Sequence, residues 1–252
     1  MKLNVISFNI LCVDAPNGNR AYSLSARAPR IQTVVEARNP DLIGFQEATP
    51  AWLELLNRDF GETYEIHNVY RSETNPESTP IAWNRTRFEC LDKGNFWFSD
   101  TPEVESRGWD ELYDCPRIFT WAHLKEKSSG KEFCFINTHF GFGDGCQIKS
   151  SRMLADFARQ MAMSCVITGD FNLEIDSPGY RELTQAFADV NARTVNDLGP
   201  TFHGFDPEKW GEHIDYCFIT SDAAPLSFEV LRELVDGDFP SDHYGLFASV
   251  EL

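Results

Sequence analysis

The order of strand-like and helix-like segments constrains the fold of this chain more than any other feature. A buried-strand pattern at residues 3–10 precedes a helical pattern at residues 24–38, and the same order returns at residues 165–187. Between them, residues 64–139 contain successive strand patterns joined by short turns. Two βα halves around a β meander indicate two packed sheets with helices on their outer faces. We therefore predict an α/β protein, a four-layer α/β/β/α sandwich with two packed mixed β-sheets.

Individual elements can be placed by residue. Helical patterns cover 24–38, a short segment from Pro50, 147–163 and 178–187. No low-complexity linker or internal repeat separates these elements, so we expect a single domain over residues 1–252. The predicted strands cover residues 3–10, 41–45, 64–68, 80–83, 87–98, 118–124, 132–139, 165–168, 214–219, 226–231 and 244–251.

The charge balance limits the partners that this chain can bind. It has 39 acidic and 22 basic side chains, which gives a formal net charge of −17. A protein that binds long duplex through phosphate contacts needs clustered Lys and Arg. We therefore expect no stable binding of long duplex, and any phosphate-bearing substrate requires a metal ion or a locally basic pocket.

The cysteines and the hydropathy pattern indicate the cellular compartment of the protein. The seven cysteines form no CxxC pair, and their odd number together with a strand-like N-terminal run favours reduced core thiols in a cytoplasmic protein. No apolar stretch approaches the roughly 20 residues that span a bilayer. We expect no membrane association.

Polar residues occur where several predicted strands end. Asn9 interrupts an apolar strand, Glu47 closes another just before a helix, and His139 precedes a glycine-rich loop, Gly141 to Gly145. Each has an ordinary alternative explanation, as a buried amide, a charge at a helix start or a structural histidine. Strand ends are nevertheless where α/β enzymes place their reactive side chains.

Two further strand ends combine carboxylates with other polar groups. In extended geometry Asp170 and Asn172 point to one face, where one group can orient a water and the other can donate to developing negative charge; an Asp/Asn-rich turn is the alternative. Asp215 and Asp242 are spaced so that each can lie beside His243, and a histidine ordered by a carboxylate is the usual general acid or base.

Together these residues form an oxygen-rich set with two imidazoles. Such a set, without sulfur ligands, favours Mg²⁺ or Mn²⁺ over Zn²⁺. The set comprises Asn9, Glu47, His139, Asp170, Asn172, Asp215, Asp242 and His243.

The same residues lie in six short motifs that resemble those of the endonuclease/exonuclease/phosphatase superfamily. The motifs are SFNI, GFQEA, NTHF, GDFN, HIDY and SDHYG, and they occur in the order typical of that family across nearly the whole chain. Six motifs in the correct order are highly specific, although each alone would not be. The resemblance implies a DNase I-like fold and hydrolysis of phosphate esters.

Carried over position by position, the resemblance assigns a role to each motif residue. It implies that Glu47 is the principal Mg²⁺ ligand, with Asn9 and Asp242 near the cation or its water. His139 would hold the scissile phosphate, and Glu77 is the acid expected to pair with it. Asp170 would orient or deprotonate the attacking water, Asn172 would support the transition state, and Asp215 with His243 would complete acid/base catalysis; whether Asp170 or His243 takes the proton stays open.

The substrate is less constrained than the chemistry. The NTHF and HIDY forms look closest to the deadenylase/nocturnin-like branch and its bacterial relatives, which favours 3′–5′ exonuclease-like cleavage of short RNA or oligonucleotides. The net charge favours the alternative, a phosphatase of a small sugar, inositol or nucleotide phosphate. A second alternative is a catalytically inactive binding module, although no motif residue is missing.

Residues 94–121 are the expected substrate-recognition segment. Trp109 and Tyr113 are candidates to stack on a base, and Arg117 is a candidate to clamp a phosphate through two parallel hydrogen bonds. Arg20, Arg27 and Arg30 are interpreted as a solvated helix face, with added positive potential near the first strand end as the alternative. We therefore expect a monomeric, cytoplasmic, Mg²⁺-dependent phosphoester hydrolase.

Overall fold

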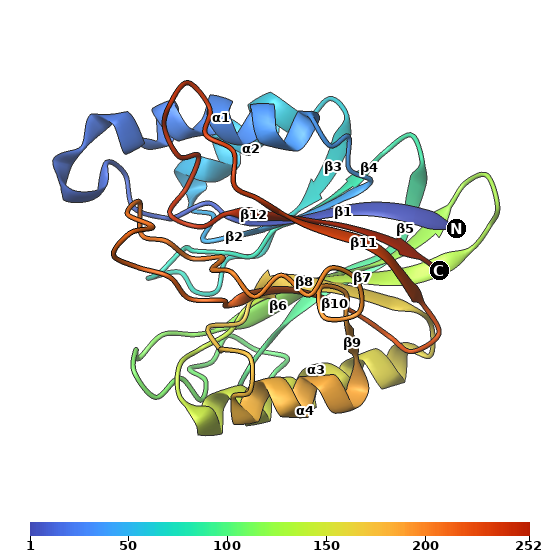
Figure 1. The fold of residues 1–252 in the computed structure, drawn as a ribbon. Helices are drawn as coiled ribbons and strands as arrows, with labels where there is room; N and C mark the ends of the chain where they lie inside the picture. The colour runs from blue at the N-terminus through green and yellow to red at the C-terminus, as the bar shows by residue number, and fades with distance from the viewer.

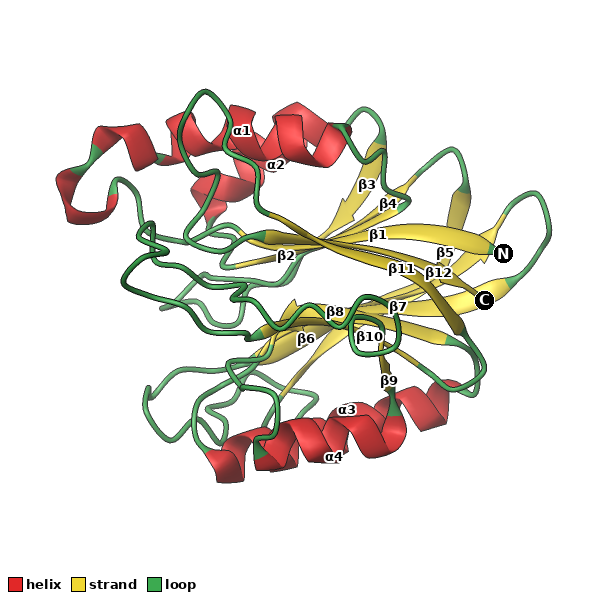
Figure 2. Cartoon of the chain, viewed as in Figure 1, coloured by secondary structure: helices red, strands yellow, loops and turns green.

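Two six-stranded sheets pack face to face, and two helices cover the outer face of each sheet (Figures 1 and 2). This arrangement is seen in a computed structural model that describes residues 1–252. The strand order is β11-β12-β1-β2-β4-β3 in the first sheet and β5-β6-β7-β8-β10-β9 in the second. The prediction of a four-layer α/β/β/α sandwich with two mixed sheets is confirmed.

Each sheet has one parallel strand pair, with antiparallel pairs around it. The parallel pairs are β1 with β2 and β7 with β8, and each is joined by a crossover helix, α1 or α3. The first sheet comprises β1 (Lys2–Asn9), β2 (Leu42–Gln46), β3 (Tyr64–His67), β4 (Ile81–Asn84), β11 (Ala224–Leu231) and β12 (Gly245–Glu251). The second comprises β5 (Phe88–Trp97), β6 (Ile118–Glu126), β7 (Glu132–His139), β8 (Cys165–Asp170), β9 (Ala188–Asp189) and β10 (Asp215–Ile219).

The apolar side chains form three layers, as the side-chain alternation of β1 illustrates. Leu3 and Val5 belong to the core between the two sheets, whereas Ile6 and Phe8 pack against the helices of the first sheet. A third cluster lies between the second sheet and its helices. The helices are α1 (Leu24–Glu36), α2 (Pro50–Phe60), α3 (Asp144–Met161) and α4 (Pro178–Ala186).

Close contact between the sheets aligns the strand ends that carry the polar motifs. A Cβ atom on Gly44 would lie 2.3 Å from Thr168 Oγ1 and 2.4 Å from Asn137 Oδ1, so only glycine allows the two sheets to approach this closely. The Asn137 amide donates to the Phe45 carbonyl oxygen (2.6 Å) and its Oδ1 accepts from Gln46 Nε2 (2.7 Å). These contacts hold the ends of β2 and β7 together.

Helix ends follow their capping residues, with small shifts from the predicted bounds. Thr49 caps α2, because its Oγ1 accepts from the Trp52 amide, and Pro50 occupies the first turn. Helix α3 begins three residues earlier than predicted, after Gly143 in a positive-φ conformation. The 3₁₀ turns at Pro16–Gly18 and Arg20–Tyr22 and the two-residue strand β9 were not predicted.

Arg27 corrects the interpretation of the first helix as a solvated basic face. Its side chain is fully buried, and its guanidinium donates to the carbonyl oxygens of Ile10, Leu11, Val13 and Tyr22. A guanidinium has five donors, and four carbonyl oxygens from the segments around the end of β1 converge on this one. Arg27 therefore braces the segment that follows Asn9.

Two further expectations concern the cysteines, predicted to be core thiols, and the absence of a segment that spans a bilayer. All seven cysteines are free thiols, four of them buried. Cys12, Cys90 and Cys115 are only half-buried, so the interpretation of all seven as core thiols is wrong for these three. No helix of the structure has the length and apolar character needed to cross a bilayer.

Candidate active site

The motif residues meet at one end of the sandwich, opposite the chain termini (Figure 1). β1, β2, β7 and β8 all end there, because each parallel pair runs in the same direction. The loops beyond these ends enclose a cavity of about 840 Å³. It is lined by Cys12, Val13, Glu47, Arg71, Asn75, Glu77, Tyr113, Asp114, Cys115, Arg117, His139, Phe142, Asp170, Asn172, Phe202, Glu212, Ile214, Asp242 and His243.

Asp170, the last residue of β8, lies at the centre of the polar residues. Its Oδ2 is 3.6 Å from His139 Nε2 and 3.8 Å from His243 Nε2, and it accepts from Asn9 Nδ2 at 2.9 Å. Burial and the neighbouring Asp215 raise the pKa of Asp170 above its ordinary value. A carboxylate between two imidazoles is well placed to orient a water and to exchange its proton.

Glu47 lies beside Asp170 in a strained backbone conformation. Its φ is +62°, which non-glycine residues adopt mostly where surrounding structure imposes it, often at functional sites. One carboxylate oxygen accepts from Asn9 Nδ2 (3.1 Å) and the other from the Cys12 amide (2.8 Å). Burial raises the pKa of Glu47, but the charge of His139 and the Cys12 amide outweigh burial and lower this pKa to about 2. Glu47 is therefore an anion available to a cation.

Asp215 and His243 form a tight carboxylate–imidazole pair. Asp215 begins β10, and its Oδ2 is 2.9 Å from His243 Nδ1. Both side chains are almost fully buried. Burial opposes protonation of the ring, but the carboxylates of Asp215, Asp242 and Asp170 together raise the pKa of His243 to about 10. The pair fixes the orientation of the imidazole toward Asp170.

His139 and Glu77 form a looser pair on the other side of Asp170. His139 Nδ1 is 3.6 Å from Glu77 Oε1 and has no hydrogen-bond partner. The same Glu77 oxygen is 2.6 Å from Arg71 Nη1. The structure thus brings Glu77 to His139, as the resemblance implies, but Glu77 is shared with an arginine that sequence reasoning missed.

Asn172 lies at the site in a different conformation from the one predicted. Strand β8 ends at Asp170, and Asn172 has a φ of +49°. Its amide N–H donates to Asp170 Oδ1 and its side-chain nitrogen donates to the Phe140 carbonyl oxygen, each at 2.9 Å. The prediction of extended geometry was wrong because a turn follows Asp170 directly, yet both side chains still line one cavity.

Asp242 lies on the rim of the same cavity, next to His243. Burial raises the pKa of Asp242 to about 6, against the opposing charges of His243 and Arg27. It belongs to none of the three-residue groups whose ligand atoms lie within 4.8 Å of one another, whereas Glu47 forms such a group with His139 and Asp170. The ligand assignment of Asp242 therefore remains a prediction.

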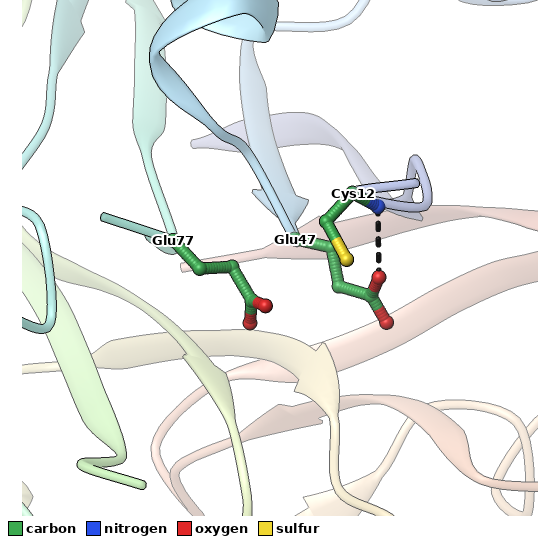
Figure 3. Close-up of side chains that lie close together, drawn as sticks. All are labelled: Cys12, Glu47 and Glu77. Atoms are coloured by element: carbon green, nitrogen blue, oxygen red, sulfur yellow. Dashed lines mark hydrogen bonds between the residues drawn. The ribbon is translucent and has the colours of Figure 1, made fainter. Parts of the chain in front are cut away.

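Cys12 and Arg71 are two polar cavity residues that the sequence analysis did not identify. Figure 3 shows the Cys12 thiol beside the carboxylate of Glu47, with Glu77 facing the same space. The three ligand atoms lie within 4.8 Å of one another. Burial and the two glutamates raise the pKa of Cys12 far above its ordinary value, so the thiol stays protonated. The only sequence signal for Arg71 was its position six residues before Glu77.

The predicted substrate residues are divided between two places. Tyr113 and Arg117 line the cavity, and Tyr113 is 54% exposed and packs against Phe142. Trp109 lies outside the cavity and lines a separate hollow with Lys149. Its indole N–H donates to Asp100 Oδ1 (3.1 Å), and Lys149 Nζ is 5.4 Å from the centre of its ring. These contacts hold Trp109 away from Asp170. The prediction that Trp109 stacks on a substrate base at the site is therefore corrected.

The donor set fits a hard divalent cation. Glu47 and Asp170 supply carboxylate oxygens that lie within reach of one ion. Buried acids crowd this region, and burial together with neighbouring carboxylates raises the pKa values of Asp170 and Asp242. A bound cation would offset that repulsion. Asn9 turns its amide nitrogen toward both carboxylates, so in this structure it positions them.

This geometry agrees with a comparison against known families. The model of the endonuclease/exonuclease/phosphatase family matches residues 6–243, which include all six motifs. The chain belongs to this family. Members of the endonuclease/exonuclease/phosphatase family hydrolyse phosphoester bonds.

Similar proteins include solved structures and one curated sequence. A family protein from Bacteroides thetaiotaomicron is 26% identical, with a TM-score of 0.91 over 99% of this chain and 97% of that chain. The mannosyl-6-phosphatase of the same organism is 26% identical, with a TM-score of 0.87 over 99% of this chain and 100% of that chain. Protein L388 of Acanthamoeba polyphaga mimivirus is 29% identical over 185 residues, 68% of each chain.

Proposed function

We propose that this protein is a Mg²⁺-dependent hydrolase of small phosphate esters, such as phosphorylated sugars or nucleotides, with Mn²⁺ as a substitute cation. The observation that carries the proposal is Asp170 between two imidazoles in a cavity of about 840 Å³. Only two Lys or Arg side chains line that cavity, Arg71 and Arg117. Together with a net charge of −17, this favours a ligand with few phosphates over a long nucleic acid.

The full-length similarity to a mannosyl-6-phosphatase supports the same substrate class. That protein is named for removing phosphate from a sugar, and it matches this chain over nearly its whole length at a TM-score of 0.87. It favours the small-ester alternative over the oligonucleotide substrate that the motif forms favoured. The sugar itself stays open.

The roles of the motif residues follow from their contacts. Glu47 and Asp170, positioned by Asn9 and joined by Asp242 at the rim, would hold the cation, which neutralises phosphate charge when bound. His139 would donate to the phosphate, and Glu77 would support it. Asp170 would orient the attacking water, the Asp215–His243 pair would exchange its proton, and Asn172 would donate to the developing charge.

Cleavage of short RNA or oligonucleotides is the second candidate, and Tyr113 is the observation that favours it. Its exposed ring stands against Phe142 in the cavity wall, with ring centres 5.3 Å apart. An exposed aromatic face at a cavity wall can stack on a base of any sequence.

A mixed substrate panel separates these candidates. Wild-type protein would be assayed with Mg²⁺ on phosphorylated sugars, inositols and nucleotides beside short 3′-labelled RNA and DNA, with Asp170→Asn and a chelator as blanks. We expect release of inorganic phosphate from a small ester and none in either blank. Stepwise shortening of RNA would favour the second candidate instead.

The same panel, together with calorimetric titration of Mg²⁺ into wild-type protein and Glu47→Ala, tests the alternative of a catalytically inactive binding module. That alternative predicts no turnover on any substrate and no heat of Mg²⁺ binding that Glu47→Ala removes.

We also propose that residues 1–252 act as one domain and as a cytoplasmic monomer. Sedimentation velocity would show a single species of about monomer mass, and a dimer would contradict the monomer.

A further inference from the structure

Two buried arginines in the cavity have most of their hydrogen-bond donors unused. Arg71 and Arg117 are the only Lys or Arg side chains that line it, and they are 8% and 6% exposed. A guanidinium carries five N–H donors, and buried donors in folded proteins are normally paired. Each of these two makes a single side-chain hydrogen bond.

Arg71 is fixed in place, but its guanidinium is not satisfied. Nη1 is 2.6 Å from Glu77 Oε1, and the Arg71 amide donates to the Glu77 carbonyl oxygen (2.9 Å). The indole of Trp97 donates to the Arg71 carbonyl oxygen at 2.8 Å. Nε is buried without a partner, and Nη2 makes no hydrogen bond to the protein.

Arg117 repeats this pattern on a different loop. Its Nε is 3.0 Å from Asp110 Oδ2, and the Asp110 side chain is 1% exposed. The other Asp110 oxygen accepts from the amides of Leu112 (3.0 Å) and Tyr113 (2.9 Å), so the carboxylate is held by the loop. The Arg117 guanidinium carbon lies 5.7 Å from the ring centre of Phe142, and Nη1 and Nη2 make no hydrogen bond.

Each carboxylate orients its arginine through one N–H and leaves the rest of the planar fork free. Such forks match the oxygens of phosphate, which accept two parallel N–H bonds. The location is also specific, because Glu77 Oε1 contacts both Arg71 (2.6 Å) and His139 (3.6 Å). Arg71 is thus next to the imidazole assigned to the phosphate.

We propose that Arg71 and Arg117 form an anion subsite on the His139 side of the cavity that binds a phosphate group of the substrate. The inference rests on the proposed function, because it concerns the same cavity. Two sources share this chemistry, namely the terminal oxygens of the scissile phosphomonoester and a second phosphate on the same molecule. Either source makes the two arginines determinants of substrate choice.

The first experiment measures binding without turnover. Inorganic phosphate, which undergoes no turnover, would be titrated calorimetrically into Mg²⁺-loaded wild-type protein and into protein carrying Arg71→Gln or Arg117→Gln. We expect the phosphate Kd to rise at least tenfold in each arginine variant and less in Arg71→Lys, which keeps the charge but loses the fork. Arg87→Lys is the matched control, because Arg87 pairs with Asp41 and Glu126 outside the cavity.

Removal of Arg117 leaves Asp110 buried without its partner, so the fold needs its own control. The double variant Arg117→Gln/Asp110→Asn replaces the ion pair with neutral groups and would be compared by thermal unfolding. An unchanged phosphate Kd in both Arg71→Gln and the double variant overturns the subsite, whatever the enzyme activity.

The second experiment distinguishes the two sources in the active protein. KM and kcat would be measured for fructose 6-phosphate and fructose 1,6-bisphosphate in wild-type protein and both Gln variants. A rise in KM for both esters assigns the subsite to the scissile phosphate, and a rise for the bisphosphate alone assigns it to the second phosphate. If wild-type protein turns over no ester of the mixed substrate panel but still binds phosphate through the arginines, the proposed function fails while the subsite stands.

Discussion

Asp170 is flanked by two imidazole–carboxylate pairs that differ in how tightly they are built. On one side, His243 Nδ1 lies 2.9 Å from Asp215 in a buried hydrogen bond. On the other, His139 Nδ1 lies 3.6 Å from Glu77 and has no partner, because Glu77 contacts Arg71 more closely, at 2.6 Å. Both imidazoles face the same Asp170 oxygen through Nε2.

The difference separates chemistry from substrate contact. A short buried carboxylate contact fixes the orientation and charge of His243 before substrate arrives, which suits proton exchange. Glu77 contacts both His139 and Arg71. The position of His139 therefore depends on Arg71, which we propose binds phosphate. We infer that the tight pair governs kcat and the loose pair governs KM, and each variant below tests that division.

Among substitutions in the two pairs, Asp215→Asn is expected to have the largest effect. An amide cannot stabilise the His243 imidazolium, so kcat should fall about 10³- to 10⁴-fold, as for a carboxylate-ordered histidine in a catalytic triad. Steady-state kinetics at saturating Mg²⁺ would measure it, with thermal unfolding to show that the fold persists. A loss confined to KM would break the proposed division.

The pH dependence of stability should also distinguish the tight pair. The pKa of His243 is raised to about 10 from an ordinary 6.5, so the protonated pair stabilises the metal-free fold fully below pH 6.5. This stabilisation, on the order of a few kcal/mol, is lost as pH rises from 6.5 through 10. Denaturant unfolding in a chelator would show that slope in wild-type protein and Glu77→Gln. A slope that persists in Asp215→Asn would contradict the assignment.

Glu77→Gln should have a smaller effect of a different kind. The amide weakens the hold on both His139 and Arg71, so KM should rise about tenfold while kcat changes little. Initial-rate measurements on a small phosphate ester would check this. If kcat fell as far as in Asp215→Asn, the two pairs would be equivalent and the comparison would fail.

Tyr113→Ala is expected to have the smallest effect. Tyr113 packs on Phe142, three residues beyond His139, and lies on the same wall as Arg117. Loss of its ring should raise KM about three- to tenfold for an ester with an aromatic base and leave a sugar phosphate unaffected. Tyr113→Phe is the matched control and should behave as wild type.

The sequence predicted the tight side of the site better than the loose side. Asp170, Asp215 and His243 lie in motifs at strand ends, and strand register places Asp170 directly opposite Asp215. Arg117 was a candidate from the sequence and lines the cavity, whereas the place of Arg71 depends on how a loop folds back over the sheets, which period-2 patterns do not encode. Trp109 shows the same limit, because a hydrogen bond to Asp100 determines which hollow its ring occupies.

Local backbone conformation explains the remaining differences. The layers and strand order follow from alternation and from the crossovers, and Gly44 marks the close approach of the sheets. The turn at Asn172 and the burial of Arg27 were missed because both satisfy unpaired carbonyl oxygens that appear only once the chain has folded. Composition alone cannot locate such groups.

The most direct test of the account is the turnover of Asp170→Asn at saturating Mg²⁺ and saturating small phosphate ester. Asp170 is the one side chain that both imidazoles face, and its amide isostere keeps the shape of the site. The account predicts that kcat falls about 10³-fold or more while the variant still binds inorganic phosphate through Arg71 and Arg117. Near-normal kcat in this variant would contradict it.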